Sequence, residues 1–152
     1  MEAITRHNTL KNLSREHHHG LMLCWKIRQG LSKDVDPERI RKYCLHFFKT
    51  HLEGHFQEEE KFIFTLLGNN HPMVKKAIDD HRYLISNFIS EPDNLKALQY
   101  IEKNLERHIR FEERELFNEI QNRIDESKLT ELTWLLRRND SASVIWADQF
   151  WK

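Results

Sequence analysis

The sequence HFQEEE occupies residues 55–60 and the sequence HIRFEE occupies residues 108–113. In each segment the leading histidine is followed four residues later by a glutamate. Each segment lies in a long stretch with helical periodicity, where residues four apart share one face of a helix. The sequence therefore predicts two helices that each present one histidine and one carboxylate to the same side. These four residues are His55, Glu59, His108 and Glu112.

Two further histidines are predicted to face the same interior from two other helices. The stretch 10–31 repeats apolar residues every three or four positions, and His17 falls on this stripe. The stretch 74–88 has a similar stripe that includes His81. Four helices would therefore each place one histidine inward, and two of them would add a carboxylate. This is a ligand set for two metal ions inside a four-helix bundle.

Turn and capping residues divide the chain into these helices. Asp36 followed by Pro37 is typical of a helix start, as an N-cap and a first helical residue. Gly30 and residues 32–36 are expected to end the first helix, and the run 68–70 the second. The helices are expected at about 10–31, 37–67, 72–88, 94–124 and 128–138, with the end of the chain, 144–152, packed on the bundle.

The predicted fold class is all-α. Because the connections are short, consecutive helices are expected to be antiparallel neighbours in an up-down-up-down four-helix bundle. A short C-terminal helix and tail would follow the bundle. No linker or low-complexity segment divides the chain, so residues 1–152 are expected to form a single domain whose bundle core spans about 10–124.

Helical periodicity also predicts which neighbours of the two His-x-x-x-Glu pairs face inward. After Glu59, the interior side of the second helix is expected to continue through Phe62 and Leu66. Glu60 and Glu113 follow the two paired glutamates directly and are rotated by roughly 100° around their helices. They are expected to face away from the site.

Composition and charge favour a small cytoplasmic protein. Lys and Arg together number 24, as do Asp and Glu, so the formal net charge is zero and neither a nucleic-acid nor a membrane partner is expected. No apolar run is long enough to cross a membrane, and the N-terminus lacks the apolar core of a signal peptide. Cys24 and Cys44 are too few for a disulfide framework and are expected to be small core residues.

Carboxylates on otherwise apolar helix faces need a positively charged partner. Burying Glu59 and Glu112 among leucine and phenylalanine would be costly, and no lysine or arginine shares their stripes nearby. A metal ion meets this requirement. Imidazole and carboxylate together suit iron, manganese or zinc, and carboxylates that bridge two ions favour an iron or manganese pair over structural zinc.

Single histidines carry less weight than the combination. A lone histidine on an apolar helix face is usually a hydrogen-bonded core residue, whereas four inward histidines with two inward glutamates indicate a metal centre. His18 and His19 flank His17 but fall off its stripe. His51 lies one turn before His55, either as a fifth histidine ligand or as a residue that lines the cavity beside the metal; the second interpretation is favoured.

Taken together, these motifs resemble the hemerythrin-like family, specifically its HHE cation-binding domains. The similarity runs from about Leu13 to Glu119 and rests on four short motifs, which are Glu16-His17, His55 to Glu59, Asp80-His81 and His108 to Glu112. The resemblance implies a non-haem centre of two iron ions, with manganese or zinc as substitutes. It also implies that Glu59 and Glu112 bridge the ions. The terminal ligands would be His17, His55, His81 and His108.

The chain differs from the oxygen-carrying members of that family. Those members carry the pattern His-x-x-x-His on the third helix, whereas here the residue four positions before His81 is Ala77. Their fourth-helix carboxylate lies five residues after the histidine, whereas here Glu112 lies four after it. Fewer histidines would leave more open coordination, which favours reaction with, or sensing of, oxygen, peroxide or nitric oxide over simple oxygen carriage.

The leading functional hypothesis is therefore a di-iron protein that binds or senses oxygen, peroxide or nitric oxide. One alternative is an enzyme with the same site, such as a peroxidase, an oxidase or a nitric-oxide-handling reductase. Another is an iron donor that repairs damaged iron–sulfur clusters; the repair members of the family usually carry an N-terminal segment with a cysteine pair, and nothing similar precedes Leu10. The last is a plain helical interaction module whose histidines are incidental.

Overall fold

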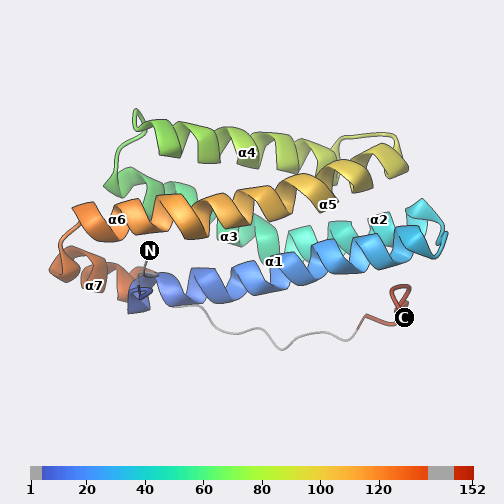
Figure 1. Cartoon of the computed structure of the whole chain (residues 1–152), viewed down its shortest axis with the longest axis horizontal. Helices are drawn as coiled ribbons and strands as arrows, with labels where there is room; N and C mark the ends of the chain where they lie inside the picture. The colour runs from blue at the N-terminus through green and yellow to red at the C-terminus, as the bar shows by residue number, and fades with distance from the viewer. Residues whose placement is uncertain (1–4, 137–145) are drawn as a thin grey trace.

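The computed structural model describes residues 5–136 and 146–152, and the regular structure in these residues is entirely helical (Figure 1). None of the helices in these ranges combines the length and apolar character that crossing a bilayer requires. Long helical rods lie side by side along the longest dimension of the molecule. The α-helices are α1 (Asn8–Ser32), α2 (Pro37–Phe47), α3 (Glu53–Glu58), α4 (Pro72–Ile89), α5 (Asn94–Phe111), α6 (Phe117–Arg123) and α7 (Glu126–Leu135). The first rod is α1, the second covers residues 37–66, the third is α4 and the fourth covers residues 94–123.

Capping side chains start the long helices close to the predicted positions. At the start of α1, α2, α4 and α5 a side chain accepts a hydrogen bond from a backbone N–H in the first turn, which satisfies a donor that has no partner within the helix. The capping residues are His7, Asp36, His71 and Asp93. Gly68 has a φ of 88° after the second rod ends, so this turn uses the left-handed conformation that glycine adopts readily.

Gly30 does not break the first helix, contrary to the sequence-based expectation. α1 continues through it to Ser32. A Cβ atom at Gly30 would lie 2.7 Å from Cδ1 of Ile40 and 2.9 Å from Cδ2 of Phe150. The glycine is therefore needed for close packing against α2 and the C-terminal segment, rather than for helix termination.

Two of the rods change helical type where the site is built. The described residues include three π-helical segments, η1 (Phe48–Leu52), η2 (Glu59–Ile63) and η4 (Glu112–Leu116), and the 3₁₀ segment η3 (Phe64–Leu66). A π-helical turn contains an extra residue, which shifts every later side chain around the axis. After Glu59 the fully buried residues are accordingly Ile63 and Phe64. Phe62 and Leu66, which were predicted to face inward, pack against the core but are only partly buried.

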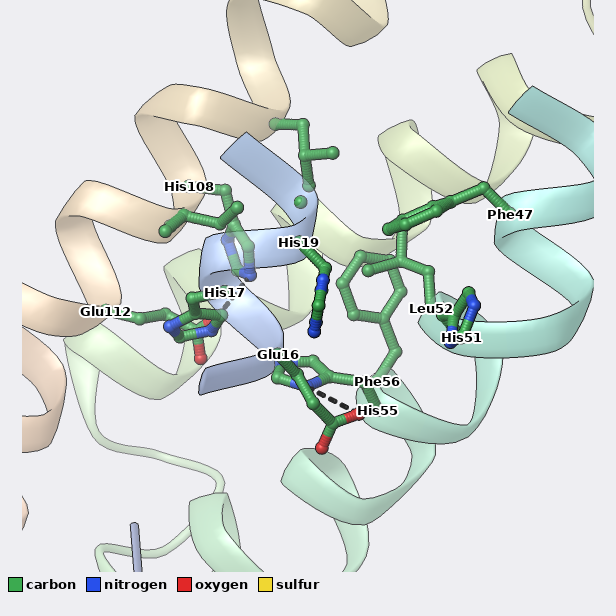
Figure 2. A pocket seen from close by; sticks show the side chains of 13 residues that line it. Glu16, His17, His19, Phe47, His51, Leu52, His55, Phe56, His108 and Glu112 are labelled. Atoms are coloured by element: carbon green, nitrogen blue, oxygen red, sulfur yellow. Dashed lines mark ion pairs between the residues drawn. The ribbon is translucent and has the colours of Figure 1, made fainter. Parts of the chain in front are cut away.

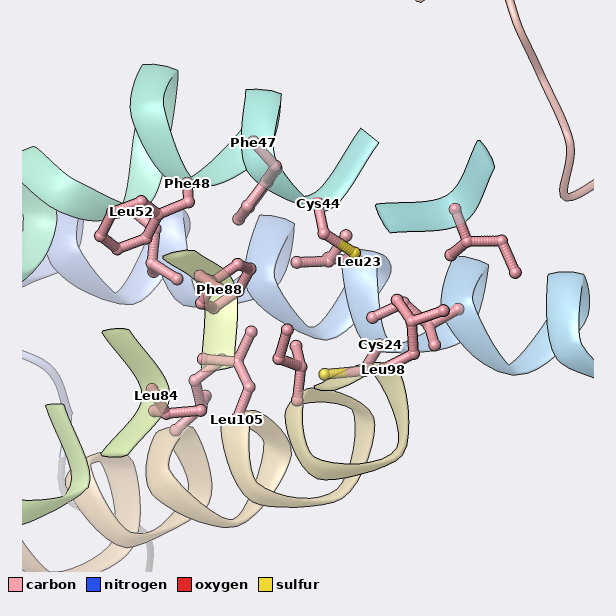
Figure 3. Packing of buried hydrophobic residues seen from close by; sticks show 14 of the residues in the cluster. Leu23, Cys24, Cys44, Phe47, Phe48, Leu52, Leu84, Phe88, Leu98 and Leu105 are labelled. Atoms are coloured by element: carbon pink, nitrogen blue, oxygen red, sulfur yellow. The ribbon is translucent and has the colours of Figure 1, made fainter. Parts of the chain in front are cut away.

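The apolar core consists of two clusters, one toward each end of the bundle. One cluster contains Leu23, Leu84 and Leu105 and is drawn in Figure 3. The other contains Leu13 and Ala77. On α1 and α4 the predicted ligand histidines fall between residues of the two clusters, so the site forms a polar layer in the middle of the bundle.

Both cysteines belong to the cluster in Figure 3. Burial raises the pKa of the Cys24 thiol to about 12 and also raises the pKa of Cys44. Both side chains are thus held as neutral thiols, which agrees with their prediction as small core residues.

The C-terminal segment packs on the bundle, as predicted for the residues that the structure describes. Phe150 is 4% exposed and its ring lies 5.7 Å from that of Tyr43. Two charged contacts hold the same segment: Arg39 donates two hydrogen bonds to Asp148, and the ammonium group of Lys26 lies 4.0 Å from the ring centre of Trp151. The preceding short helix, expected at 128–138, is α7; residues 137–145 lie outside the described ranges.

The substitution Phe150→Ala is expected to lower the free energy of unfolding by about 3 kcal/mol, because it leaves a cavity beside Gly30 and Ile40. Urea unfolding followed by circular dichroism measures this. The exposed Lys152→Ala variant is the control and is expected to change stability by less than about 0.5 kcal/mol. An equal loss in both variants would show that Phe150 does not anchor the segment.

Candidate metal centre

Six side chains from four rods converge in the middle of the bundle, and all are those predicted from the sequence. They form two groups in which one ligand atom per residue lies within 4.8 Å of the others. Group A is His17, His55, Glu59 and Glu112, and group B is Glu59, His81, His108 and Glu112. The two glutamates belong to both groups and are completely buried, and none of the histidines is more than 4% exposed.

The distances in group B match those between atoms that share one ion. Nε2 of His81 lies 3.1 Å from Nε2 of His108 and 3.1 Å from a carboxylate oxygen of Glu59. Nε2 of His108 lies 2.6 Å from Oε1 of Glu112. Two donor atoms bound to one ion at about 2.1 Å, with their bonds at right angles, lie roughly 3 Å apart. Group B is therefore close to a coordination arrangement.

Group A is slightly more open. Nε2 of His17 lies 3.4 Å from Glu112 and 3.7 Å from Glu59, and Nε2 of His55 lies 3.3 Å from Glu59. The histidine rings of this group have centres 4.9 Å apart. All four histidines thus turn the same atom, Nε2, toward the two shared carboxylates.

Several buried polar atoms of the site lack a hydrogen-bond partner, which is the test of whether a metal fits. Both carboxylate oxygens of Glu112, Oε2 of Glu59 and Nε2 of His17 are buried and form no contact with hydrogen-bond geometry, although all but Oε2 of Glu112 lie within ion-pair distance of an opposite group. Leaving such atoms unsatisfied costs roughly 1–3 kcal/mol each, and more for charged groups. A metal ion in each group would accept electron pairs from these atoms. The donor set of imidazole and carboxylate suits iron, manganese or zinc.

Four further carboxylates, which sequence reasoning did not assign to the site, contact the outer nitrogens of the histidines. Glu60 and Glu113 were expected to face away, and that expectation was wrong: Oε2 of Glu60 lies 3.0 Å from Nδ1 of His81, and Oε2 of Glu113 lies 3.5 Å from Nδ1 of His17. The reason is that a rotation of about 100° points a side chain toward the neighbouring helix, not toward solvent.

The other two carboxylates directly precede histidines in the chain. Asp80 contacts Nδ1 of His108 at 3.0 Å, and Glu16 contacts Nδ1 of His55 at 3.7 Å. Their sequence signal was an acidic residue just before each of the lone helical histidines, in Glu16-His17 and Asp80-His81. Glu16, Glu60, Asp80 and Glu113 are called the outer carboxylates below.

A small pocket reaches group A from one side of the bundle. Its cavity volume is about 20 Å³, which is enough for roughly one water-sized molecule. Figure 2 shows His17, His55 and Glu112 on this pocket, together with Glu16 and the dashed ion pair between Glu16 and His55. Both histidines of group A line the pocket, whereas group B contributes only one of its histidines, His108.

His51 lines the outer part of this pocket and belongs to neither ligand group. It is exposed, and its ring stacks near that of His19 at 6.4 Å between centres and packs on Phe47 at 5.3 Å. The expectation that it shares the buried face of His55 was wrong, because η1 places an extra residue in the turn between them and Leu52 takes the buried position.

The carboxylates dominate the electrostatics of the site. Burial alone would lower the pKa of His55 and of His108, yet the negative charges of Glu59 and Glu112 beside them raise both to about 9. The same competition raises the pKa of His17 and of His81. In return, the imidazoles hold the pKa of Glu59 well below its usual range despite its burial. In the absence of metal, protons on the histidines therefore balance the negative charge of the buried glutamates.

This balance predicts that the metal-free protein becomes less stable as the pH rises. The pKa of His55 and of His108 is about 9 in the folded protein and 6.5 in its ordinary state. The stabilisation is present in full below pH 6.5 and is lost as the pH rises through 9. Thermal melts of chelator-treated protein across this range measure the effect. A metal-loaded sample is the control, since metal binding displaces these protons. A pH-independent melting temperature of the metal-free form would contradict the prediction.

Comparison with known proteins agrees with this arrangement. The family model described as the Hemerythrin HHE cation binding domain matches residues 8–120, which include all six inward ligand candidates and the four outer carboxylates. Neither the comparison with curated proteins nor that with solved structures found a match.

Proposed function

We propose, since the chain belongs to the hemerythrin HHE cation-binding family, that it is a non-haem di-iron protein that binds or senses oxygen, peroxide or nitric oxide. The family and the two clusters of histidine and glutamate make this a metal-binding helical domain. The observation that carries the rest is the sharing of Glu59 and Glu112 by both groups. One carboxylate from each of two rods stands between two sets of two histidines, which is the arrangement that carboxylate-bridged ion pairs need.

The pocket supports a small ligand. Its volume of about 20 Å³ suits a molecule of the size of oxygen or peroxide. Bound iron would supply redox chemistry and an open coordination position. The chain itself supplies a buried, nearly dry chamber, because Phe56 and Phe117 lie against the ligand histidines. His51 would stand at the pocket as a hydrogen-bond or proton donor.

Two measurements test the proposal. Protein purified from iron-supplied cells is expected to contain two iron ions per chain by elemental analysis. Optical spectra of the reduced protein with oxygen, peroxide and azide should then change upon addition of each. A long-lived oxygen adduct supports binding or sensing, whereas rapid conversion to a ferric product with peroxide turnover supports an enzyme. Absence of metal, or a single zinc ion, would contradict the di-iron proposal.

The variant His51→Ala tests whether His51 only lines the pocket or is itself a metal ligand. It is expected to keep both iron ions and to alter the lifetime of an oxygen adduct or the rate of reaction with peroxide. His17→Ala, by contrast, is expected to lose metal. Loss of iron from His51→Ala would make His51 a ligand.

The order of the rods is also part of the proposal. We infer the up-down-up-down arrangement from the short connections and from the contacts of α5 with both α1 and α4. The cytoplasmic location stays a prediction from the sequence.

A further inference from the structure

The outer carboxylates connect neighbouring helices in a closed ring around the site. Each of the four rods contributes one ligand histidine and one outer carboxylate. In every case the carboxylate contacts Nδ1 of a histidine on a different rod. The four pairs are Glu16 with His55, Glu60 with His81, Asp80 with His108 and Glu113 with His17. Followed from pair to pair, they lead from α1 to the second rod, then to α4, to the fourth rod and back to α1.

The chemistry of each pair fixes the state of the imidazole. An ionised carboxylate has only acceptor oxygens, so an Nδ1 that is hydrogen-bonded to it must carry the hydrogen, and a carboxylate at longer range favours the same state. In a neutral imidazole the hydrogen is then absent from Nε2, whose electron pair is free for a metal ion. The geometry agrees at all four histidines, because each turns Nδ1 to an outer carboxylate and Nε2 to the shared glutamates.

We propose that the ring of outer carboxylates positions the four histidines for metal binding and sets the affinity of the site. The outer carboxylates are positioning residues, since they contact the ligand histidines and belong to neither ligand group. This inference rests on the proposed function, because it needs metal in the two groups. The inference goes beyond the proposed function, because it assigns a role to four residues outside the predicted ligand set.

The ring is not uniform. The two pairs of group B, Glu60 with His81 and Asp80 with His108, are hydrogen bonds of 3.0 Å. The two pairs of group A are 3.5 and 3.7 Å long, beyond ordinary hydrogen-bond length. Both histidines of group A also line the pocket, against one of group B. The ring therefore holds group B more firmly than group A, which contributes more histidines to the pocket that a small ligand would enter.

The test uses the full chain and ferrous ion under anaerobic conditions, with affinity measured by competition against a chromophoric chelator. Asp80→Ala and Glu60→Ala are each expected to weaken iron binding 10- to 100-fold, the usual cost of removing the carboxylate partner of a metal-bound histidine. Asp79→Ala is the matched control: Asp79 is adjacent to Asp80, but its exposed side chain forms an ion pair with Arg82 at 3.6 Å and belongs to neither group, so the iron affinity should stay unchanged. Glu16→Ala is expected to cost less than Asp80→Ala.

Metal-free stability provides the second readout. If Asp80 acted only in folding, Asp80→Ala would lower the melting temperature of the chelator-treated protein and leave the iron affinity unchanged, and this result would overturn the inference. An affinity loss with metal-free melting and helical circular dichroism close to those of the parent supports it. A Glu16→Ala loss as large as that of Asp80→Ala would overturn the ranking of the two groups. If the parent protein itself binds no iron, the proposed function fails instead.

Discussion

Glu59→Ala is expected to reduce the metal content from two ions per chain to none. Glu59 belongs to both groups, and its side chain is completely buried between histidines of three rods. Without it, each ion loses an oxygen ligand, and two cations would face one another with half of the neutralising charge. Elemental analysis of purified protein and the optical spectrum of the iron-loaded form measure the outcome. Glu112→Ala is expected to behave in the same way, because Glu112 is also shared.

Neighbouring glutamates provide the controls for this loss. Glu58→Ala removes the carboxylate next to Glu59, and Glu115→Ala removes an exposed one on η4; both lie outside the two groups and should leave both ions bound. Glu113 is not a neutral control, since it contacts His17. Two retained ions and an unchanged spectrum in Glu59→Ala would show that this residue does not bridge the pair.

Removing the metal is expected to loosen the protein without unfolding it. Ions that bind only the folded state contribute about 4 kcal/mol per site when free metal exceeds Kd a thousandfold. For two sites in a chain of this size, that lowers the melting temperature by roughly 20 to 30 °C when a chelator removes the metal. The two apolar clusters at the ends of the bundle remain intact, so the helical circular dichroism should persist.

Thermal melts with and without chelator, followed by circular dichroism, measure this difference. The Glu59→Ala protein is the control, because a chain that holds no metal should melt at one temperature in both conditions. A metal-free parent protein that is already unfolded at room temperature would contradict the prediction, as would a melting temperature that chelation leaves unchanged.

The sequence was sufficient to predict which six side chains meet in the interior, although their role as ligands remains a prediction. The reason is geometric. His17 and His81 lie within regular α-helix, and His55 and His108 each lie four residues before a shared glutamate, with α-helix up to it. A period of 3.6 residues therefore places all six correctly. Capping residues such as Asp36 and Asp93 were predictable for a similar reason, because each side chain bonds to a backbone N–H only two or three residues further along the chain.

Features that depend on another helix, or on a change in helical type, could not be predicted in this way. Whether Glu60 points to solvent or to His81 depends on where α4 lies, and the period of one helix contains no such information. The π-helical segments shifted the buried face away from His51 and Phe62, since no residue pattern in the sequence marks an extra residue in a turn. Gly30 was misjudged for the same reason: its partner Phe150 is distant in sequence.

The shared glutamates give the bundle a property that neither half of the chain has alone. Each half repeats the same pattern, one lone histidine and one His-x-x-x-Glu pair, yet each group draws a carboxylate from η2 and another from η4. A polypeptide cut in the turn at Gly68 would leave two fragments, and neither would contain a complete coordination sphere. Two bound metal ions would therefore act as a non-covalent cross-link between the two halves. During synthesis, this cross-link could form only after η4 has left the ribosome.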